Sequence, residues 1–208
     1  MRGFLGPGPV DVHVRHAWPL VDELAGLGTI VDLGSGGGVP ALVLAVALPA
    51  SNWALVEAQQ RRAVWLTDAA RALGVADRVL VLHERAEVTG RGPWRGRAAA
   101  VVSRAFGPPA VTAECAAPLL AVGATCWVSE PPGPGGGRRS AGTHGPAGDE
   151  GPASVEGSGG DRWPAGGLAE LGLSFARRAP GWAGLTAVAA CPDRYPRRVG
   201  IPAKRPLF

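Results

Sequence analysis

The residues best suited to ligand chemistry are a run of glycines and two acidic side chains, each of which follows a short apolar run. The segment Asp32-Leu-Gly-Ser-Gly-Gly-Gly38 comes directly after the apolar residues 29–31. Glycines at such a point let the backbone turn sharply and approach a ligand closely. Glu57 ends the next apolar run, and a carboxylate there can accept hydrogen bonds from both hydroxyls of a ribose. Glu87 follows a third run and could accept from an adenine amino group.

Two ligand classes compete for the glycine segment. A dinucleotide-binding loop has the pattern G-x-G-x-x-G, which needs a third small residue at position 39, and this chain has Val39 there. Gly34, Gly36 and Gly38 instead give G-x-G-x-G, with Asp32 two residues before the first glycine. This spacing resembles the S-adenosylmethionine loop of class I methyltransferases. A tight turn between a strand and a helix, without any ligand, needs the same glycines and stays open as an alternative.

Arg104 follows a fourth apolar run, and its guanidinium could hold a carboxylate or a phosphate through two hydrogen bonds. A surface arginine in a chain rich in Arg is the alternative. Phe106 could stack on a base or pack in the core. The four histidines lack metal-ligand spacing, and we interpret His13 and His16 as helix-surface or packing residues. We expect no metal and assign no catalytic acid or base.

The elements that must position these residues alternate between strands and helices. Strands of this kind joined by helices predict right-handed βαβ units, a mostly parallel sheet and a Rossmann-like α/β fold. The acids that follow the first three strands would then converge on one edge of the sheet. The expected strands cover 29–34, 53–57, 78–82, 98–103 and 124–129, and the expected helices cover 11–26, 38–48, 60–73 and 109–120.

The later part of the chain changes character after the fifth expected strand. Residues 131–160 contain 11 Gly and 5 Pro, so they cannot bury enough apolar surface to fold, and we expect a disordered insertion. A short helix at 164–172 and strands at 173–178 and 185–190 would close the sheet with an antiparallel hairpin. The expected organisation is therefore an N-terminal helical segment 1–28, a ligand-binding core 29–130, the insertion 131–163, the terminal helix and hairpin 164–191, and a basic tail 192–208.

The net charge of +4 arises in that tail, which has five basic side chains and one acid. Such a patch suits a phosphate backbone, and a solvated tail is the alternative. The five candidate nucleic-acid contacts are Arg194, Arg197, Arg198, Lys204 and Arg205.

Three cysteines without a close pair favour a reducing compartment over a disulfide framework. The first residues lack the apolar run of a signal peptide, and the longest apolar stretch, 39–50, is too short to span a bilayer. We expect a cytoplasmic protein, monomeric and without membrane contact.

Four stretches resemble the RsmG or GidB family of ribosomal RNA guanine-N7 methyltransferases. Val31-Asp-Leu-Gly-Ser-Gly-Gly-Gly-Val-Pro40 is similar to the family's VDxGSGxGxPG, and Glu57-Ala-Gln-Gln-Arg-Arg-Ala-Val-Trp-Leu66 to its D/E-x-x-x-K-R-x-x-F-L. Ser103-Arg-Ala-Phe106 is similar to [ST]-R-A-[VF], and the ending from Tyr195 to Leu207 to YPRxxGxPxKxPL. The chain departs from the family in its short N-terminal part and in having Ser-Glu-Pro-Pro132 where the family has Lys-Gly.

The resemblance implies a class I methyltransferase with S-adenosylmethionine as donor and a guanine of 16S rRNA, free or in the small ribosomal subunit, as acceptor. Three rival functions stay open: a methyltransferase of small molecules or proteins, a non-catalytic paralogue that binds cofactor or ribosome, and an NAD-dependent oxidoreductase. The predicted cofactor contacts, taken from the motifs and from the glycine segment, are Asp32, Gly34, Gly36, Gly38, Val39, Glu57, Ala58, Gln59, Ala86, Glu87 and Arg104.

Overall fold

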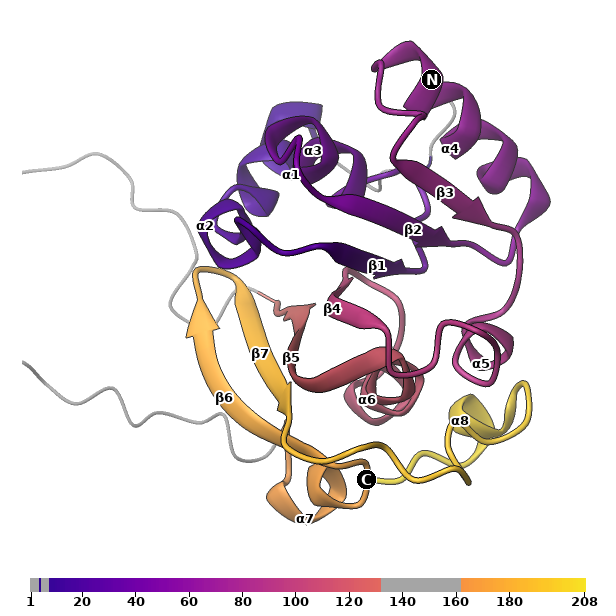
Figure 1. The fold of residues 1–208 in the computed structure, drawn as a ribbon. Coiled ribbons are helices and arrows are strands. Elements are labelled where there is room, and N and C mark those ends of the chain that lie inside the picture. The colour runs from indigo at the N-terminus through magenta and orange to yellow at the C-terminus, as the bar shows by residue number, and fades with distance from the viewer. Residues whose placement is uncertain (1–3, 5–7, 132–161) are drawn as a thin grey trace, which may run out of the picture.

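A seven-stranded sheet forms the centre of the molecule in the computed structural model, which describes residue 4 and residues 8–131 and 162–208 (Figure 1). The strand order is β3-β2-β1-β4-β5-β7-β6. The strands are β1 (Thr29–Leu33), β2 (Asn52–Val56), β3 (Val79–Leu82), β4 (Ala98–Ser103), β5 (Leu120–Ser129), β6 (Leu173–Ala179) and β7 (Trp182–Ala187).

Strands β1 to β5 are mutually parallel, and β7 pairs antiparallel with both β5 and β6. The expected Rossmann-like α/β fold with a terminal antiparallel hairpin is thus confirmed. Because parallel strands end at the same edge, the residues that follow β1, β2, β3 and β4 gather on one side of the molecule.

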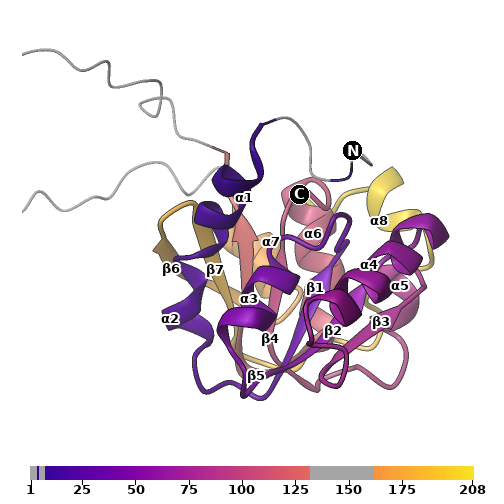
Figure 2. The same cartoon turned by 90° about the horizontal axis from the view of Figure 1, so that it is seen from above.

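Helices cover both faces of the sheet, and Figure 2 shows α3 and α4 in front of it and α6 behind it. The helices are α1 (Val10–Ala17), α2 (Leu20–Leu24), α3 (Ala41–Ala47), α4 (Gln60–Ala72), α5 (Ala86–Thr89), α6 (Pro109–Ala116), the 3-10 turn η1 (Ala117–Leu119), α7 (Ala165–Ala169) and α8 (Ile201–Lys204).

Two apolar cores lie on the two faces, because successive side chains of a strand point to opposite sides. Ile30, Leu55 and Val102 pack on the face covered by α1 to α4. Val31 and Val101 pack on the other face, with α6 and α7. Burial of both faces explains why the strands read as nearly continuous apolar runs.

Several predicted boundaries are wrong for identifiable reasons. The helix expected at 11–26 is two helices, because Pro19 caps α2 and cannot continue α1. Strand β7 begins at Trp182 rather than at 185, since Pro180 and Gly181, with Gly181 at φ +80°, make a short hairpin turn. Helix α5 (Ala86–Thr89) is not among the expected helices, and β5 starts at Leu120, where we expected a helix to end. Most of the predicted insertion 131–163 lies outside the described residues.

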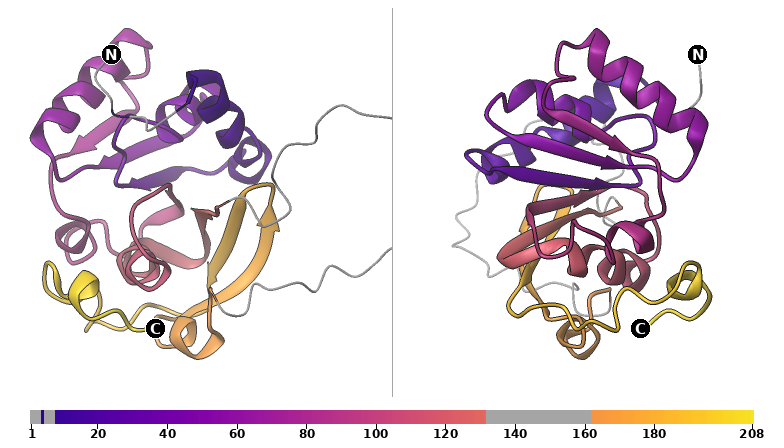
Figure 3. Two further views of the ribbon diagram at one scale, coloured as in Figure 1. Left: turned by 180° about the vertical axis from the view of Figure 1, so that it is seen from behind. Right: turned by 45° about the vertical axis from the view of Figure 1, so that its right-hand side comes forward.

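The C-terminal segment returns from the hairpin to the other side of the molecule. Figure 3 shows it running past the sheet to α8, which lies close to α5 and α6. Within the described ranges, no helix combines the length and the apolar character needed to traverse a lipid bilayer.

Candidate functional site

The glycine segment crosses over the end of β2. The backbone N–H groups of Gly34 and Ser35 both donate to the carbonyl of Val56, at 2.9 and 3.1 Å. Gly34 has φ +69°, and a Cβ there would lie 2.7 Å from Cδ2 of Phe106. Gly38 has φ +87°, and a Cβ there would lie 2.5 Å from Cδ1 of Leu42. Only glycine satisfies both the left-handed backbone and the close approach at these two positions.

Glu57 follows β2 and is tied to this segment. Its Oε2 accepts from the N–H of Gly36 at 2.9 Å, and its Oε1 accepts from the N–H of Gln59 at 2.8 Å. The side chain is 4% exposed. Each carboxylate oxygen can accept a second hydrogen bond, so Glu57 stays able to bind hydroxyl groups of a ligand.

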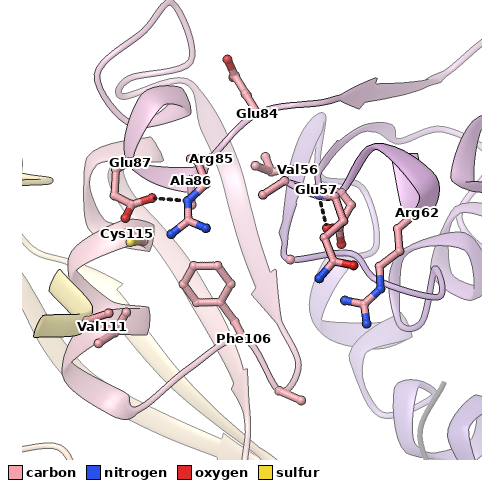
Figure 4. Close-up of a pocket in the computed structure, with 15 residues that line it drawn as sticks. Val56, Glu57, Arg62, Glu84, Arg85, Ala86, Glu87, Phe106, Val111 and Cys115 are labelled. Atoms are coloured by element: carbon pink, nitrogen blue, oxygen red, sulfur yellow. Dashed lines mark hydrogen bonds and ion pairs between the residues drawn. The ribbon is translucent and has the colours of Figure 1, made fainter. Parts of the chain in front are cut away.

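A pocket of about 290 Å³ opens beside Glu57. Figure 4 shows Glu57 and Glu87 on opposite sides of it, with the ring of Phe106 between them. Val56 and Val111 add apolar wall, so the pocket combines a flat apolar surface with acidic edges. Six of the predicted cofactor residues line it: Gly34, Glu57, Ala58, Gln59, Ala86 and Glu87.

Glu87, in α5, is 6% exposed and has a partner that the sequence did not indicate. Its Oε1 accepts from the backbone N–H of Gly200 at 2.9 Å, and its Oε2 lies 3.7 Å from Nε of Arg85. Ala203 of α8 also lines the pocket. The C-terminal segment therefore forms part of the pocket wall.

Sequence reasoning missed several other lining residues, among them Arg62, Glu84, Arg85 and Cys115. Arg62 stands in the stretch after Glu57, and Glu84 and Arg85 immediately precede Ala86, so proximity to the predicted residues was an available signal. No comparable signal marked Cys115 or Ala203, which reach the pocket from distant segments.

Asp32 lies near the end of β1, outside the lining of this pocket, and is 1% exposed. The pKa of Asp32 is raised to about 7. Burial is the largest cause and the charge of Glu57 adds to it, while a hydrogen bond from Ser35 and the charge of Arg104 oppose the rise. Its Oδ2 has no hydrogen-bond partner among the described residues. Gly36, Gly38 and Val39 likewise lie beside the pocket rather than in its lining.

Arg104 follows β4 at the same sheet edge. Its Nη2 donates to Nδ1 of His13 at 2.6 Å, and its buried Nη1 has no partner in the described part of the chain. Burial lowers the pKa of Arg104, and the charge of Asp32 opposes that effect. We interpreted His13 as a surface or packing residue, and the structure instead places it in contact with Arg104.

The basic tail divides into one internal and four exposed cations. Arg197 binds the fully buried Glu114 of α6 through Nε at 2.9 Å, Nη2 at 2.6 Å and its backbone N–H at 2.8 Å. Its Nη2 also donates to the carbonyl of Arg205. We therefore withdraw Arg197 from the predicted nucleic-acid contacts, because these bonds occupy its guanidinium. Exposed side chains remain at Arg194, Arg198, Lys204 and Arg205.

No group of three His, Cys, Asp or Glu side chains within residues 8–131 and 162–208 is arranged to hold a metal ion. The thiols of Cys115 and Cys126 are buried, and burial raises the pKa of both. They act as small apolar residues of the core.

Solved structures with related folds include YjhP from E. coli, which aligns with a TM-score of 0.50, 19% identity and coverage of 62% of this chain and 52% of that one. A geranyl diphosphate C-methyltransferase from Streptomyces coelicolor aligns with a TM-score of 0.49 and 19% identity over 62% of this chain and 54% of that one. The first of these likenesses supports the fold alone.

Two relatives in sequence are described as ribosomal RNA small subunit methyltransferase G. The protein from Synechococcus sp. WH7803 is 42% identical over 50% of this chain and 42% of its own length. The protein from Synechococcus sp. RCC307 is 34% identical over 86% of this chain and 70% of its own length. The chain thus matches less than half the length of the first of these relatives. A family model described as GidB, rRNA small subunit methyltransferase G, matches residues 12–128, more than half of the chain. The chain belongs to the GidB family of rRNA small subunit methyltransferases.

Proposed function

We propose that this protein transfers a methyl group from S-adenosylmethionine to N7 of a guanine in 16S rRNA. The observation that carries the proposal is Glu57, which follows β2, lines the pocket and is held by the glycine segment. Membership of the family narrows the substrate class to ribosomal RNA. We expect the protein to act as a monomer in the cytoplasm.

The residues present fit an adenosyl cofactor. A carboxylate with free acceptor sites suits two ribose hydroxyls, and Glu57 supplies one. The apolar side chains of Val56, Phe106 and Val111 suit the faces of a purine. Glu87 stands at the opposite edge, where a carboxylate suits an exocyclic amino group.

The amino-acid end of the cofactor carries both an ammonium and a carboxylate. Among the residues that the structure describes, Oδ2 of Asp32 is an acceptor without a partner and Nη1 of Arg104 is a donor without a partner, at the ends of the neighbouring strands β1 and β4. We therefore assign Asp32 and Arg104 to this end of the cofactor, and Glu57 to its ribose.

The chemistry requires no proton acceptor. The bound donor supplies an electrophilic methyl group on a sulfonium sulfur. The N7 atom of guanine has a free lone pair and bears no proton, so the protein needs to position the acceptor and exclude water rather than remove a proton. Acidic groups such as Asp32 would favour positive charge near the site.

We assign contact with rRNA phosphates to Arg194, Arg198, Lys204 and Arg205. Gly200 and Ala203 join the C-terminal segment to the pocket, and Arg198 lies two residues before Gly200 while Lys204 immediately follows Ala203. Cations at that position would hold the RNA backbone while one base enters the site.

Cofactor binding is tested by calorimetric titration with S-adenosylhomocysteine. We expect wild-type protein to bind it and Glu57→Ala to bind it at least about tenfold more weakly, because the ribose loses its acceptor. Asp77→Ala, which removes an exposed acid before β3, is the matched control and should bind like wild type. Equal affinity of all three proteins would contradict the assignment of Glu57.

Methyl transfer is tested by mapping N7-methylguanine in 16S rRNA from a deletion strain. One modified guanine should be lost, restored by the wild-type gene and not by Gly36→Asp, because a side chain is strained at the φ of +53° that Gly36 adopts. Persistence of every N7-methylguanine in the deletion strain would reject the proposed acceptor.

A second candidate is a family member that binds cofactor without transferring methyl groups. It is favoured by the stretch Ser129-Glu-Pro-Pro132, which replaces the Lys-Gly of the family and whose Glu130 is held by Trp163, Arg162 and Arg178. Binding of S-adenosylhomocysteine together with unchanged 16S rRNA in the deletion strain would support this candidate.

A further inference from the structure

A histidine of the N-terminal helix contacts the arginine that follows β4. His13 lies in α1 and Arg104 lies 91 residues later, with Nη2 of Arg104 and Nδ1 of His13 2.6 Å apart. His13 does not belong to the pocket lining or to any family motif described above. Neither the pocket nor the motifs therefore explain why His13 contacts Arg104.

The direction of this hydrogen bond fixes the protonation state of His13. A guanidinium has donors and no acceptor, so Nδ1 of His13 must accept. The imidazole is then neutral, with its proton on Nε2. A protonated imidazole would present an N–H to the N–H of Arg104 and would add a second positive charge beside it.

The other titratable groups near His13 and Arg104 come from α1 and β1. His16, one turn further along α1, has its pKa lowered by burial and by the charges of Arg104 and His13. Asp32 interacts with Arg104 from the end of β1. Helix α3, which packs against α1, has no titratable side chain. Of this cluster, Arg104 is the group that stays positively charged at neutral pH.

We propose that His13 is a positioning residue for Arg104 in binding the cofactor's carboxylate. By accepting from Nη2, the imidazole fixes the guanidinium plane and leaves Nη1, buried and unpartnered in the described part of the chain, to donate to the ligand. The inference rests on the proposed function, since it takes the ligand of Arg104 to be the amino-acid end of S-adenosylmethionine.

Two probes isolate this end of the cofactor. S-adenosylhomocysteine carries the carboxylate, and methylthioadenosine has the same nucleoside without the amino-acid group. At pH 8, His13→Ala should lower the affinity for S-adenosylhomocysteine by about tenfold and leave the affinity for methylthioadenosine nearly unchanged, because one charge-assisted contact is lost. His13→Asn should bind both probes nearly as wild type does, since its Oδ1 can occupy the place of Nδ1.

The outcomes separate this inference from the proposed function. Absence of wild-type binding to either probe would overturn both. If wild-type protein binds the probes and His13→Ala has the same ratio of the two affinities as wild type, the role of His13 alone is overturned. Loss of 16S rRNA binding in His13→Ala with intact cofactor binding would also overturn the role of His13, because it would assign Arg104 to a phosphate of the acceptor. If His13→Ala fails to fold, His13→Leu, which keeps apolar volume but has no acceptor, takes its place, and the wild-type ratio of the two affinities in His13→Leu overturns the inference.

Discussion

Asp32 shows how a single buried carboxyl group can make a methyltransferase fold sensitive to pH. Burial raises its pKa to about 7 from 3.8, so the folded state holds the proton more tightly than the unfolded chain does. The resulting stabilisation is fully present below pH 3.8 and is lost as the pH rises through about 7. The gap corresponds to about 4 kcal/mol at most.

Replacing Asp32 by an uncharged isostere should remove this loss. We expect Asp32→Asn to gain stability relative to wild type as the pH rises from 5 to 8, because the amide has no charge to bury. Urea unfolding at several pH values measures the difference in the free energy of unfolding. Asp68→Asn, at an exposed acid of α4, is the control and should show no such trend. A constant difference between Asp32→Asn and wild type would contradict the raised pKa.

Gly38 is constrained both by its left-handed backbone angle and by close packing against Leu42. We expect Gly38→Ala to lower the free energy of unfolding by about 2 to 4 kcal/mol, from the left-handed backbone and from overpacking against Leu42. Gly74→Ala is the matched control: its φ is +68°, and a Cβ there has nothing within 4 Å. Its cost should be limited to about 1 to 2 kcal/mol from the backbone. Equal costs measured by urea unfolding would show that contact with Leu42 is relieved without penalty.

At the scale of elements, helix α6 holds the C-terminal segment through one buried ion pair. Glu114 is fully buried, and Arg197 supplies three hydrogen bonds to it. Glu87 of α5 holds the same segment through the N–H of Gly200. These two acids join the end of the chain to the pocket, so the segment that carries the basic side chains also forms part of the pocket wall.

Removing either partner of the Glu114–Arg197 pair should be costly. We expect Glu114→Ala and Arg197→Ala each to destabilise the protein by about 3 to 5 kcal/mol, because the remaining charge loses its partner. The double variant should cost less than the sum of the two. Denaturant unfolding measures these values, and hydrogen exchange should show lower protection in α8. Arg198→Ala, at the next and exposed residue, should change neither quantity, and additive costs in the double variant would argue against coupling.

At the scale of the whole molecule, the net charge of +4 arises from the C-terminal segment that borders the pocket. Electrostatic attraction of RNA would therefore act beside the proposed site of methyl transfer rather than evenly over the surface. The salt dependence of RNA binding therefore tests whether the basic side chains of this segment contact RNA.

Neutralising the exposed cations Arg198, Lys204 and Arg205 together should weaken RNA binding and lower the slope of log affinity against log salt by about 2. Filter binding to a 16S rRNA fragment at several salt concentrations measures both. Neutralising Arg15, Arg71 and Arg177, which lie on other elements, removes the same charge and should change the slope little. Equal slopes for the two triple variants would assign RNA binding to net charge alone.

The sequence by itself determined the order of strands and helices, the turn at the glycine segment and the place of Glu57, because periodic burial and glycine requirements are local properties of the chain. Pro19 and the turn at Gly181 shifted boundaries without changing this order. Only the tertiary structure decided that Arg197 faces inward to Glu114, that Gly200 binds Glu87 and that His13 reaches Arg104. These partners lie 83 to 113 residues apart, and their pairing depends on how the elements pack, which no local pattern specifies.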